Sequence, residues 1–428
     1  MNKLKWPFIV AVVFFVFSSF VFAAADKDYF VGAYYYPWYG NNNFHDGSNP
    51  TGQNSLVYHL NPRVTPLLGW YNQTHADVIS QHYKWARYAG IDFFVTSYWG
   101  SGKTEDVIIR NYMFNNPDRG DIKLAVFLEP SITISNITAE TYYLCDNYFY
   151  RPGYYLIDDN PVVFIYVTRA MSDANLTTYI TALRTAATSK GYTVYIAGDE
   201  VWGSSSNFKA SRVSQMDAIT NYDVYGNLGR ARFVTDSILD TWQSRNASWK
   251  GLANGIGKQF IPAVSPGFNN RGIGSDLPAS SRKLNSESYA FGTLFSGMLD
   301  RAKSTADMNM IMVTSWNEWH EDTQIEPTIS APPTNVDDSN TTQNYTQGLY
   351  YNGYGMLYLN ILRDKTTMLA LCDYDDDGRV DFYDLSFLLD YWLGTCTTDV
   401  NCIEADFTTN GTINFADFEI CAQQWTGQ

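Results

Sequence analysis

The chain has 428 residues, of which 45% are hydrophobic and 16% aromatic, enough apolar material for a large folded core. This composition excludes a generally disordered protein. The formal net charge is −15, and so acidic a chain is a poor partner for nucleic acid. Much of the charge lies at one end, because residues 372–428 contain twelve acidic residues and a single basic one, Arg379.

The N-terminal segment, residues 1–25, has the pattern of a secretory signal peptide. Two lysines precede an apolar run at residues 8–22, and three alanines at 23–25 supply the small-residue cleavage site. The run is shorter than the ~20 residues of a membrane-spanning helix, although an uncleaved anchor is the alternative. We therefore expect a secreted or cell-surface protein whose mature chain starts near Asp26.

Short apolar runs, each typical of a buried strand, recur from residue 29 to residue 313. Amphipathic segments such as 76–88, 177–190 and 286–303 lie between consecutive runs, so strand and helix alternate. This order predicts a (β/α)₈ TIM barrel of the α/β class over residues 26–367. The eight predicted strands are Tyr29–Tyr35, Asp92–Thr96, Lys123–Leu128, Pro161–Val167, Thr193–Ala197, Ala218–Asn221, Gln259–Val264 and Met310–Val313.

The residues that follow the predicted strands are rich in carboxylates and large aromatic side chains. In a barrel these strand exits form one rim, where active sites are built from several loops. We therefore expect a binding site along this rim. The exits are Tyr36–Gly40, Ser97–Gly100, Glu129–Pro130, Gly198–Glu200, Tyr222–Asp223, Pro266–Phe268 and Trp316–Glu321.

The last exit, TSWNEWHEDTQIEP at residues 314–327, carries the strongest chemical signal. Glu318 and Glu321 stand three residues apart among tryptophans and a histidine, and in a turn such side chains become neighbours. An aromatic wall can raise the pKa of one carboxyl so that it donates a proton, while the other stays ionised as a base. This pattern predicts a glycoside hydrolase with Glu318 and Glu321 as catalytic residues. The structural alternative is an aromatic helix start whose acids favour the positive helix end.

The region after the last strand contains the predicted domain boundary. Residues 330–345 are typical of a surface loop, 347–362 of a final packing helix and 363–371 of a linker. We place the boundary near Met368, with a small all-helical domain at residues 368–428.

The small domain contains a repeat typical of paired calcium loops. The segment that starts at Asp373 returns 33 residues later at Asp406, with oxygen side chains at loop positions 1, 3, 5, 9 and 12 and glycine at position 6. Position 7 contributes its backbone carbonyl. The pattern predicts two Ca²⁺ ions, with an acidic solvated turn as the alternative. The predicted ligands are Asp373, Asp375, Asp377, Arg379, Asp381, Asp384, Asp406, Thr408, Asn410, Thr412, Asn414 and Asp417.

The cysteines are divided between the two domains. Cys145 stands alone in the larger one, where we expect a buried thiol. Cys372, Cys396, Cys402 and Cys421 all lie in the small domain, which in a secreted chain predicts two disulfides. Three pairings are possible, and the spacing does not choose among them.

The repeat resembles the type I dockerin module over about 55 residues. In that module each loop is followed by a helix, which corresponds here to Phe382–Leu393 and Phe415–Trp425. The resemblance implies two Ca²⁺ ions and a cohesin-type partner. A self-contained stabilising cap is the alternative.

The larger domain resembles glycoside hydrolase family 99, the endo-α-1,2-mannosidases and mannanases. The segments that carry the likeness are YYYPWYG at 34–40, residues 67–100, FLEP at 127–130, NYDVYG at 221–226 and the motif at 314–327. The resemblance implies a (β/α)₈ barrel and retaining hydrolysis through a 1,2-anhydro sugar without a catalytic cofactor. It also implies that Glu318 acts as base on the 2-hydroxyl and Glu321 as general acid/base. The expected substrate-binding residues are Tyr36, Trp38, Tyr39, His59, Trp99, Glu129, Glu200, Tyr222, Tyr225, Asn317, Trp319 and His320.

Two departures from the family pattern concern the sugar sites. Residues 41–61 lack the family's HWNH-like segment, leaving His59 as its counterpart, and Tyr98 stands where a tryptophan is more usual. The resemblance therefore supports the type of reaction better than it supports the identity of the mannan substrate. A hydrolase of another α-linked polysaccharide, such as an α-glucan or a sulfated glycan, is one alternative. A non-catalytic glycan-binding protein displayed through its tail is the other.

Overall fold

The computed structural model describes residues 29–40, 55–339 and 344–367, and in the C-terminal part 372, 374, 380–395, 402, 405–406, 411–423 and 425. The chain divides into two compact units, with residues 27–369 in one and 370–428 in the other. The predicted signal peptide lies outside the described residues. Within these ranges, no helix combines the length and the apolar character that crossing a membrane requires.

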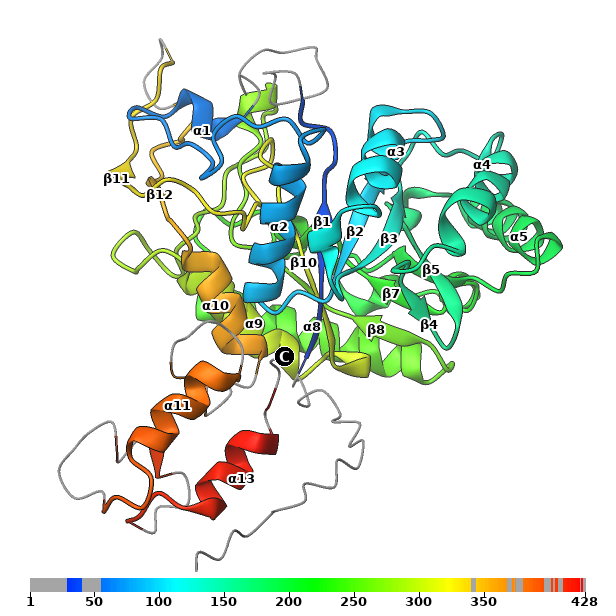
Figure 1. The fold of residues 1–428 in the computed structure, drawn as a ribbon. Helices are drawn as coiled ribbons and strands as arrows, with labels where there is room; N and C mark the ends of the chain where they lie inside the picture. The colour runs from blue at the N-terminus through cyan, green and yellow to red at the C-terminus, as the bar shows by residue number, and fades with distance from the viewer. Residues whose placement is uncertain are drawn as a thin grey trace, which may run out of the picture. The chain divides into compact units, whose positions relative to one another are not determined.

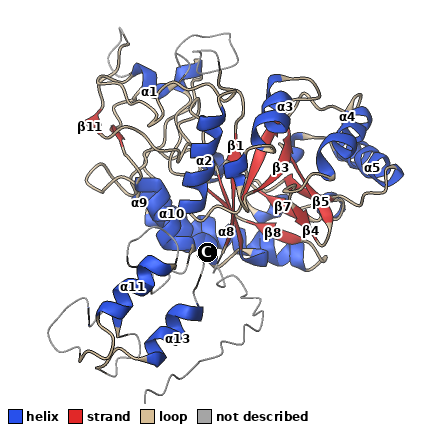
Figure 2. Ribbon diagram, viewed as in Figure 1, coloured by secondary structure: helices blue, strands red, loops and turns tan. Residues whose placement is uncertain are grey.

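The larger unit is built on a parallel sheet that lies inside a layer of helices (Figure 1, Figure 2). Its strand order is β8-β7-β6-β5-β3-β2-β1-β10-β9, with β4 antiparallel to β5. The strands are β1 (Phe30–Tyr35), β2 (Phe93–Tyr98), β3 (Lys123–Leu128), β4 (Leu156–Ile157), β5 (Asn160–Ile165), β6 (Tyr195–Asp199), β7 (Ala218–Thr220), β8 (Gln259–Ile261), β9 (Ala263–Val264) and β10 (Met310–Val313).

The sheet is a nearly closed barrel, because one segment of chain pairs with both of its ends. β8 and β9 are separated only by Pro262, which has no N–H for the ladder. β8 pairs with β7 on one side and β9 with β10 on the other. The Pro262 carbonyl still accepts a hydrogen bond from the Met312 N–H at 2.9 Å. Counted as one interrupted strand, they give the eight predicted positions, so the predicted parallel barrel is confirmed.

The strands are apolar along their whole length because both faces of a parallel sheet are covered. All six residues of β2, FFVTSY, are buried. Close packing inside the barrel depends on Gly32 of β1, where an added Cβ would lie 2.3 Å from the Phe93 ring. The interior of the barrel is therefore a filled core, and any binding site must lie at its ends.

Helices follow the strands around the outside of the barrel. In α2 the buried residues Val78, Ile79, His82, Tyr83 and Ala86 recur with helical spacing, as its amphipathic sequence predicts. The helices of this unit are α1 (Leu56–His59), α2 (Ala76–Tyr88), α3 (Thr104–Ile108), α4 (Ile137–Leu144), α5 (Asp173–Ser189), α6 (Ala210–Val213), α7 (Val224–Asn227), α8 (Asp236–Asn254), α9 (Thr293–Lys303) and α10 (Leu357–Thr366).

Two sequence predictions about the last third of this unit are wrong. The predicted helix at 286–303 begins only at Thr293, after Gly292 with φ +83°. The predicted helix at 347–362 contains β12 (Tyr351–Gly353), which pairs with β11 (Ala331–Thr334) inside the predicted loop. Gly355, with φ +58°, separates β12 from α10. In both places the apolar pattern suggests a longer helix than the structure contains, and a glycine with positive φ precedes the point where the helix begins.

The smaller unit has two described helices, α11 (Phe382–Asp390) and α13 (Phe415–Gln423). A capping box begins α11, since the Asp381 carboxylate accepts from the Tyr383 N–H and Asp384 accepts from the Asp381 N–H, both at 2.8 Å. A disulfide joins Cys372 to Cys421, which decides one of the open pairings. Cys402 is also disulfide-bonded, Cys145 is a buried free thiol as predicted, and Cys396 lies outside the described residues.

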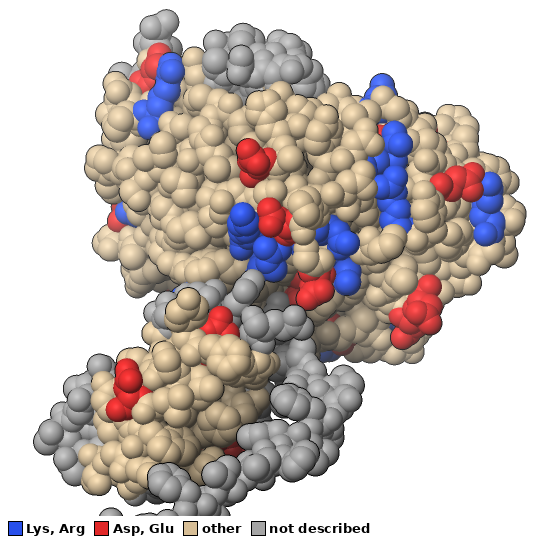
Figure 3. All heavy atoms as spheres, in the orientation of Figure 1, with Lys and Arg blue, Asp and Glu red and all other residues tan. Residues whose placement is uncertain are grey.

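Charged side chains are sparse on the face of the molecule drawn in Figure 3. Lysines, arginines and acidic residues lie scattered among uncharged residues, often beside a side chain of opposite sign. The described residues include exposed ion pairs, such as Lys84 and Asp118 at 3.7 Å. This face of the described residues has no broad patch of one charge, which agrees with the low charged fraction of 17%.

Candidate active site

The motif after β10 folds back on itself and brings its two glutamates together. The Ser315 N–H bonds to the Thr323 carbonyl at 2.8 Å, and the Glu326 N–H bonds to the Trp316 carbonyl at 2.9 Å. At the tip, the Glu321 N–H bonds to the Glu318 carbonyl at 3.3 Å. Glu318 and Glu321 therefore occupy the ends of a turn, the arrangement that their spacing predicts.

Glu326 anchors this turn through buried hydrogen bonds. It is fully buried, and its carboxylate accepts hydrogen bonds from Trp319 Nε1 at 3.0 Å and the Tyr71 hydroxyl at 2.7 Å. Its other oxygen lies 3.1 Å from His82 Nε2. Trp319 has no exposed surface and does not line the cavity, so the structure does not support its predicted contact with substrate. Its indole holds the loop that carries the glutamates.

Asn317 and Tyr39 lock the exit of β1 to the exit of β10. Asn317 Oδ1 accepts from the Tyr36 N–H at 2.7 Å, and its amide donates to the Tyr36 carbonyl at 3.1 Å. The Tyr39 hydroxyl donates to the Asn317 carbonyl at 2.7 Å and accepts from the Trp319 N–H at 3.2 Å. Both side chains are fully buried, so they support the site from behind and do not line its cavity.

Arg282 anchors the far end of the same turn. Its guanidinium, 2% exposed, donates to Asp322 Oδ1 at 2.9 Å and to the Gln324 carbonyl at 3.1 Å. Asp322 directly follows Glu321 and has a left-handed backbone with φ +52°. The ion pair therefore fixes the backbone on which Glu321 stands.

A cavity of about 430 Å³ opens at the strand exits above the two glutamates. It contains three carboxyl groups and no lysine or arginine. Trp38 and Trp99 are partly exposed, so their rings can pack against sugar faces. The lining residues are Tyr36, Trp38, Trp99, Glu129, Pro130, Tyr166, Tyr222, Ile273, Glu318, His320 and Glu321.

Burial without a cation raises the pKa of all three carboxyl groups. It raises the pKa of Glu318, of Glu321 and of Glu129 to about 8 each. The charge of Glu318 raises the pKa of Glu321 further, because two like charges in one cavity oppose each other. The pair therefore retains a proton near neutral pH, which general acid catalysis requires.

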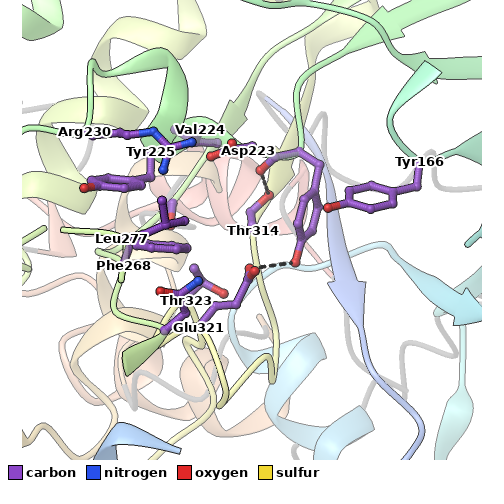
Figure 4. A pocket seen from close by; sticks show the side chains of 13 residues that line it. Tyr166, Asp223, Val224, Tyr225, Arg230, Phe268, Leu277, Thr314, Glu321 and Thr323 are labelled. Atoms are coloured by element: carbon purple, nitrogen blue, oxygen red, sulfur yellow. Dashed lines mark hydrogen bonds between the residues drawn. The ribbon is translucent and has the colours of Figure 1, made fainter. Parts of the chain in front are cut away.

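The two glutamates differ in their hydrogen-bond donors. Glu318 Oε1 accepts from the His320 N–H at 3.0 Å, and His320 Nδ1 lies 2.8 Å from the same oxygen. Glu321 Oε2 accepts a hydrogen bond from the Tyr222 hydroxyl at 3.3 Å, drawn as a dashed line to Glu321 in Figure 4. Tyr222 in turn accepts from the Tyr36 hydroxyl. N–H donors favour the ionised form, so Glu318 suits a base and Glu321 an acid.

Two further cavities adjoin the central one along the rim. The first, of about 170 Å³, shares Tyr166, Tyr222 and Glu321 with it. Tyr225 lies there, stacked on Phe268 with ring centroids 4.4 Å apart. The other, of about 350 Å³ and mainly apolar, shares Glu129, Pro130 and Tyr166 with the central cavity. The three cavities therefore form a row that is linked by shared wall residues.

Two predicted substrate-binding residues lie elsewhere. Glu200 pairs with the buried Arg212, with Oε2 3.1 Å from Nη2, and lines a separate cavity. His59 Nδ1 lies 2.9 Å from Asp338 Oδ1, and its ring stacks on Tyr345 at 3.8 Å. Neither lines a cavity that contains Glu318 or Glu321, so the structure does not support either role. Asp338 is 279 positions from His59 in the sequence, whereas Arg212 is 12 positions from Glu200.

The cavities also contain residues that the sequence prediction missed. Tyr166 directly follows β5, so the strand-exit rule could have found it. Asp223 and Phe268 lie at the predicted strand exits, although neither is among the predicted substrate-binding residues. Arg230 and Asn270 are on long loops, and no sequence motif marks them.

The predicted calcium ligands are only partly within the described residues. Asp381, Asp384, Asp406, Thr412, Asn414 and Asp417 are described, whereas Asp373, Asp375, Asp377, Arg379, Thr408 and Asn410 lie outside. In the described part, no three His, Cys, Asp or Glu side chains are grouped to hold a metal.

A model of the glycosyl hydrolase family 99 sequence matches residues 26–352, most of the barrel unit. The chain belongs to glycosyl hydrolase family 99. This family 99 enzyme is 25% identical over 343 residues to a glycoprotein endo-alpha-1,2-mannosidase of Rattus norvegicus, covering 71% of this chain and 68% of the relative. A Xenopus laevis protein of the same name is 25% identical over 347 residues, covering 71% and 70%.

A solved structure supports the same fold. The GH99 endo-alpha-mannosidase from Bacteroides thetaiotaomicron superposes with a TM-score of 0.55 at 20% identity, covering 79% of this chain and 98% of that one. The family membership makes the protein a glycoside hydrolase, and the turn that carries Glu318 and Glu321 lies inside the matched region.

Proposed function

We propose that this family 99 hydrolase is a secreted, retaining, endo-acting enzyme that cleaves α-mannosidic linkages of the α-1,2-mannan type. The observation that carries the proposal is the pair Glu318 and Glu321, adjacent on one turn in a cavity without a cation. The names of the rat and frog relatives support the substrate class. The row of three adjoining cavities supports endo action, because it gives room for sugars on both sides of the cleaved bond.

In the first step Glu318 takes the proton of the substrate's 2-hydroxyl while that oxygen attacks C1. Glu321 gives its proton to the glycosidic oxygen, which leaves, and a 1,2-anhydro sugar remains. The α-mannoside geometry suits this route, because its axial 2-hydroxyl is anti to the axial leaving group. The donors to Glu318 favour its ionised form, while burial keeps the proton on Glu321.

In the second step water attacks C1 and Glu321 accepts the water proton. The C1–O2 bond breaks, and O2 regains a proton from Glu318, so both carboxyl groups return to their starting states. Two inversions at C1 leave the configuration retained. The Tyr222 hydroxyl donates to Glu321 when Glu321 gives up its proton and when it accepts one. This hydrogen bond keeps the Glu321 carboxyl oriented between the cavities.

Product analysis tests the substrate class. Wild-type enzyme and Glu321→Gln are incubated side by side with α-1,2-branched mannan, an α-glucan and a sulfated α-glycan, and products are separated by chromatography. We expect the wild type to release oligosaccharides from mannan and the variant to release none. Cleavage of another glycan without cleavage of mannan would refute the substrate class. Retention of glycans in affinity electrophoresis without new reducing ends would instead identify a binding protein.

A substrate analogue tests the route. A mannan oligosaccharide whose 2-hydroxyl at the cleaved unit is methylated cannot form the 1,2-anhydro sugar. We expect no cleavage of the methylated compound, with the unmethylated compound as control. Cleavage of both at similar rates would mean that a protein carboxylate is the nucleophile.

We also propose that the smaller unit binds two Ca²⁺ ions. Asp384, Asp406 and Asp417 are buried at the two copies of the repeat, and carboxylate oxygens are the ligands that Ca²⁺ prefers. These carboxylates accept from the N–H groups of Tyr374, Gly411 and Asn414 at 2.7, 2.6 and 2.9 Å, which directs them toward the loops. Ca²⁺, when bound, would neutralise them.

Calorimetric titration with Ca²⁺ and thermal unfolding with and without a chelator test this site. We expect binding with a stoichiometry of two and a lower melting temperature of the smaller unit after chelation. The barrel transition should not move. No heat of binding would refute the site.

The signal pattern at residues 1–25 and the Cys372–Cys421 disulfide support secretion, because disulfides persist outside the cytosol. We propose a cohesin-type protein as the partner of the smaller unit. A calcium-dependent pull-down against purified cohesin modules tests it. Absence of capture with intact Ca²⁺ loops would favour a stabilising cap.

A further inference from the structure

A cavity of about 620 Å³ at the exits of β5 and β6 has no part in the proposed mechanism. It shares no lining residue with the cavities that contain Glu318 or Glu321. It does share Ala170 and Met171 with the mainly apolar cavity of 350 Å³, which in turn adjoins the central one. The cavity therefore continues the row along the rim, away from the glutamate pair.

One wall of this cavity is an ion pair whose hydrogen bonds are already made within the protein. The Arg212 guanidinium donates to both oxygens of Glu200, to Asp173 Oδ1 at 2.7 Å, and to the carbonyls of Met171 and Thr168 at 2.9 and 2.7 Å. A guanidinium has five N–H donors, so Arg212 has none left for a ligand. We therefore assign the Arg212–Glu200 pair no contact with a ligand.

Arg169 is held in place but keeps donors for a ligand. Its Nη1 nitrogen donates to the buried Asp199 carboxylate, and its guanidinium lies over the Trp202 ring, 4.8 Å from the ring centroid. Among the described residues, Arg169 Nε and Nη2 have no hydrogen-bond partner. The side chain is only 16% exposed. These contacts fix a planar group whose remaining N–H donors are available to a molecule that enters the cavity.

The exposed edge of the cavity adds acceptors and an apolar surface. Asp173 and Asn207 are exposed and supply side-chain oxygens. The Asn207 amide donates to the Trp202 carbonyl at 3.0 Å, which leaves its Oδ1 atom as an acceptor. The Trp202 ring is partly exposed. Sugars present hydroxyl groups beside apolar C–H faces, and this combination of donors, acceptors and an aromatic ring suits them.

The charges of the cavity are balanced, which indicates the charge of its ligand. Lys209 lies 3.3 Å from Asp173, and both arginines of the cavity are paired with buried carboxylates. Such a cavity has no excess of either sign to attract an ion. The ligand that fits is therefore neutral and carries several hydroxyl groups.

We propose that this cavity binds a segment of the polysaccharide that lies outside the part being cleaved, with its hydroxyl groups held by Arg169, Asp173, Asn207 and Lys209. The inference rests on the proposed function and adds a second binding site for the same polymer. Because both sites open on one rim, a branched chain can occupy them together. Attachment at the second site then raises the effective concentration of cleavable bonds at Glu321, an advantage that only long substrates gain.

Substrates of different length test the assignment. The double variant Asn207→Ala/Lys209→Met removes two exposed side chains and should fold as the wild type does. We expect it to lower kcat/KM for α-1,2-branched mannan about five-fold or more, because two contacts with the polymer are lost. For the shortest mannan oligosaccharide that the wild type cleaves, kcat/KM should change by less than about two-fold.

Binding without turnover gives a second readout. Affinity electrophoresis in gels that contain mannan measures the Kd of Glu321→Gln, which binds the polymer but should not cleave it. Adding Asn207→Ala/Lys209→Met to this variant should raise the Kd about five-fold or more.

Asn115→Ala/Lys190→Met is the matched control. The Asn115 amide donates to the Asn111 carbonyl at 3.4 Å, and Lys190 pairs with Asp146 at 2.8 Å, so contacts of the same kinds are removed. Neither side chain lines a cavity of the row. This variant should cleave both substrates and bind mannan as the wild-type sequence does at these positions.

Three outcomes would overturn the assignment, and each has a different meaning. Equal losses on the polymer and the short oligosaccharide would mean that Asn207 and Lys209 act on the catalytic groups. An unchanged Kd together with unchanged cleavage of the polymer would mean that the cavity does not bind it, while the proposed function stands. Wild-type enzyme inactive on both substrates, with no binding of mannan by Glu321→Gln, would remove the proposed function and this site with it.

Discussion

Two sets of buried carboxylates lie at the strand exits of this barrel, and they differ in their neighbours. Glu129, Glu318 and Glu321 share a cavity without lysine or arginine. Asp199 and Glu200, at the end of β6, are each paired with an arginine, Asp199 with Arg169 and Glu200 with Arg212. The sequence patterns around the two sets are similar, since both place acids directly after an apolar strand.

The two sets differ in whether a cation faces the buried carboxylate. Burial, together with the charges of Glu318 and Asp223, raises the pKa of Glu321 to about 8, so a proton is available for transfer. Burial raises the pKa of Asp199 too, but Arg169 opposes that effect. Asp199 also accepts from the N–H groups of Tyr222 and Val167 at 3.0 Å each. It therefore positions Tyr222, the residue that donates to Glu321.

The largest expected effect comes from replacing carboxyls of the cation-free set with amides. Glu321→Gln and Glu318→Gln should each lower kcat by about 10²–10⁴-fold, because the acid or the base is lost. Their melting temperatures should stay equal or rise, since the cavity then contains one buried carboxyl fewer that can ionise. Glu200→Gln, the same change in the paired set, is the control. Its kcat should stay near the wild-type value, and a large loss there would remove the distinction between the sets.

Breaking an ion pair should instead reduce stability. Arg212 and Glu200 are 5% and 6% exposed, so Arg212→Met leaves a buried charge unpaired and should cost about 3–5 kcal/mol of unfolding free energy. Urea unfolding measures the loss. The double variant Arg212→Met/Glu200→Leu should recover part of it, because no charge is then buried alone. A double variant as unstable as the single one would mean that Arg212 acts through its other contacts.

The barrel strands could be predicted because buried parallel strands are continuous apolar runs, such as Met310–Val313. Boundaries near 292 and 355 could not, because they depend on glycines with positive φ that leave no mark in a hydrophobic pattern. Strand β12 could not be predicted either. Its pairing partner β11 lies in a proline-containing segment that we expect to be a loop.

The cavity residues were predictable to the extent that they follow strands directly. Tyr36, Trp38, Trp99, Glu129, Tyr222 and His320 all lie at strand exits and all line the central cavity. Glu200 meets the same rule but points to Arg212, a partner that only the fold brings near. Arg230 and Asn270 lie several residues beyond their strands, where loop conformation decides direction. The position of a residue relative to a strand therefore predicted, for most of these residues, whether it lines the cavity. The sequence did not reveal which side chains pair in the folded protein.

The comparison also predicts a pH dependence of stability. The pKa of Glu129 is raised to about 8 in the folded protein, above the ordinary value of 4.5, so the folded state binds more protons than the unfolded state between these values. The unfolding free energy should therefore fall as pH rises from about 5 to 8. Glu129→Gln should flatten this slope in urea unfolding measured across the range. An unchanged slope in the variant would mean that Glu129 is ionised in the fold.

The smallest effect is expected where solvent, not burial, surrounds the charges. Lys84 and Asp118 are 3.7 Å apart, with side chains 54% and 39% exposed. Water screens both groups in either state, so Lys84→Met should change the unfolding free energy by less than about 1 kcal/mol and leave kcat unchanged. Urea unfolding beside Arg212→Met provides the direct comparison. A loss of unfolding free energy as large as that of Arg212→Met would mean that charge pairing stabilises this barrel regardless of burial. Burial would then no longer explain why the two carboxylate sets differ.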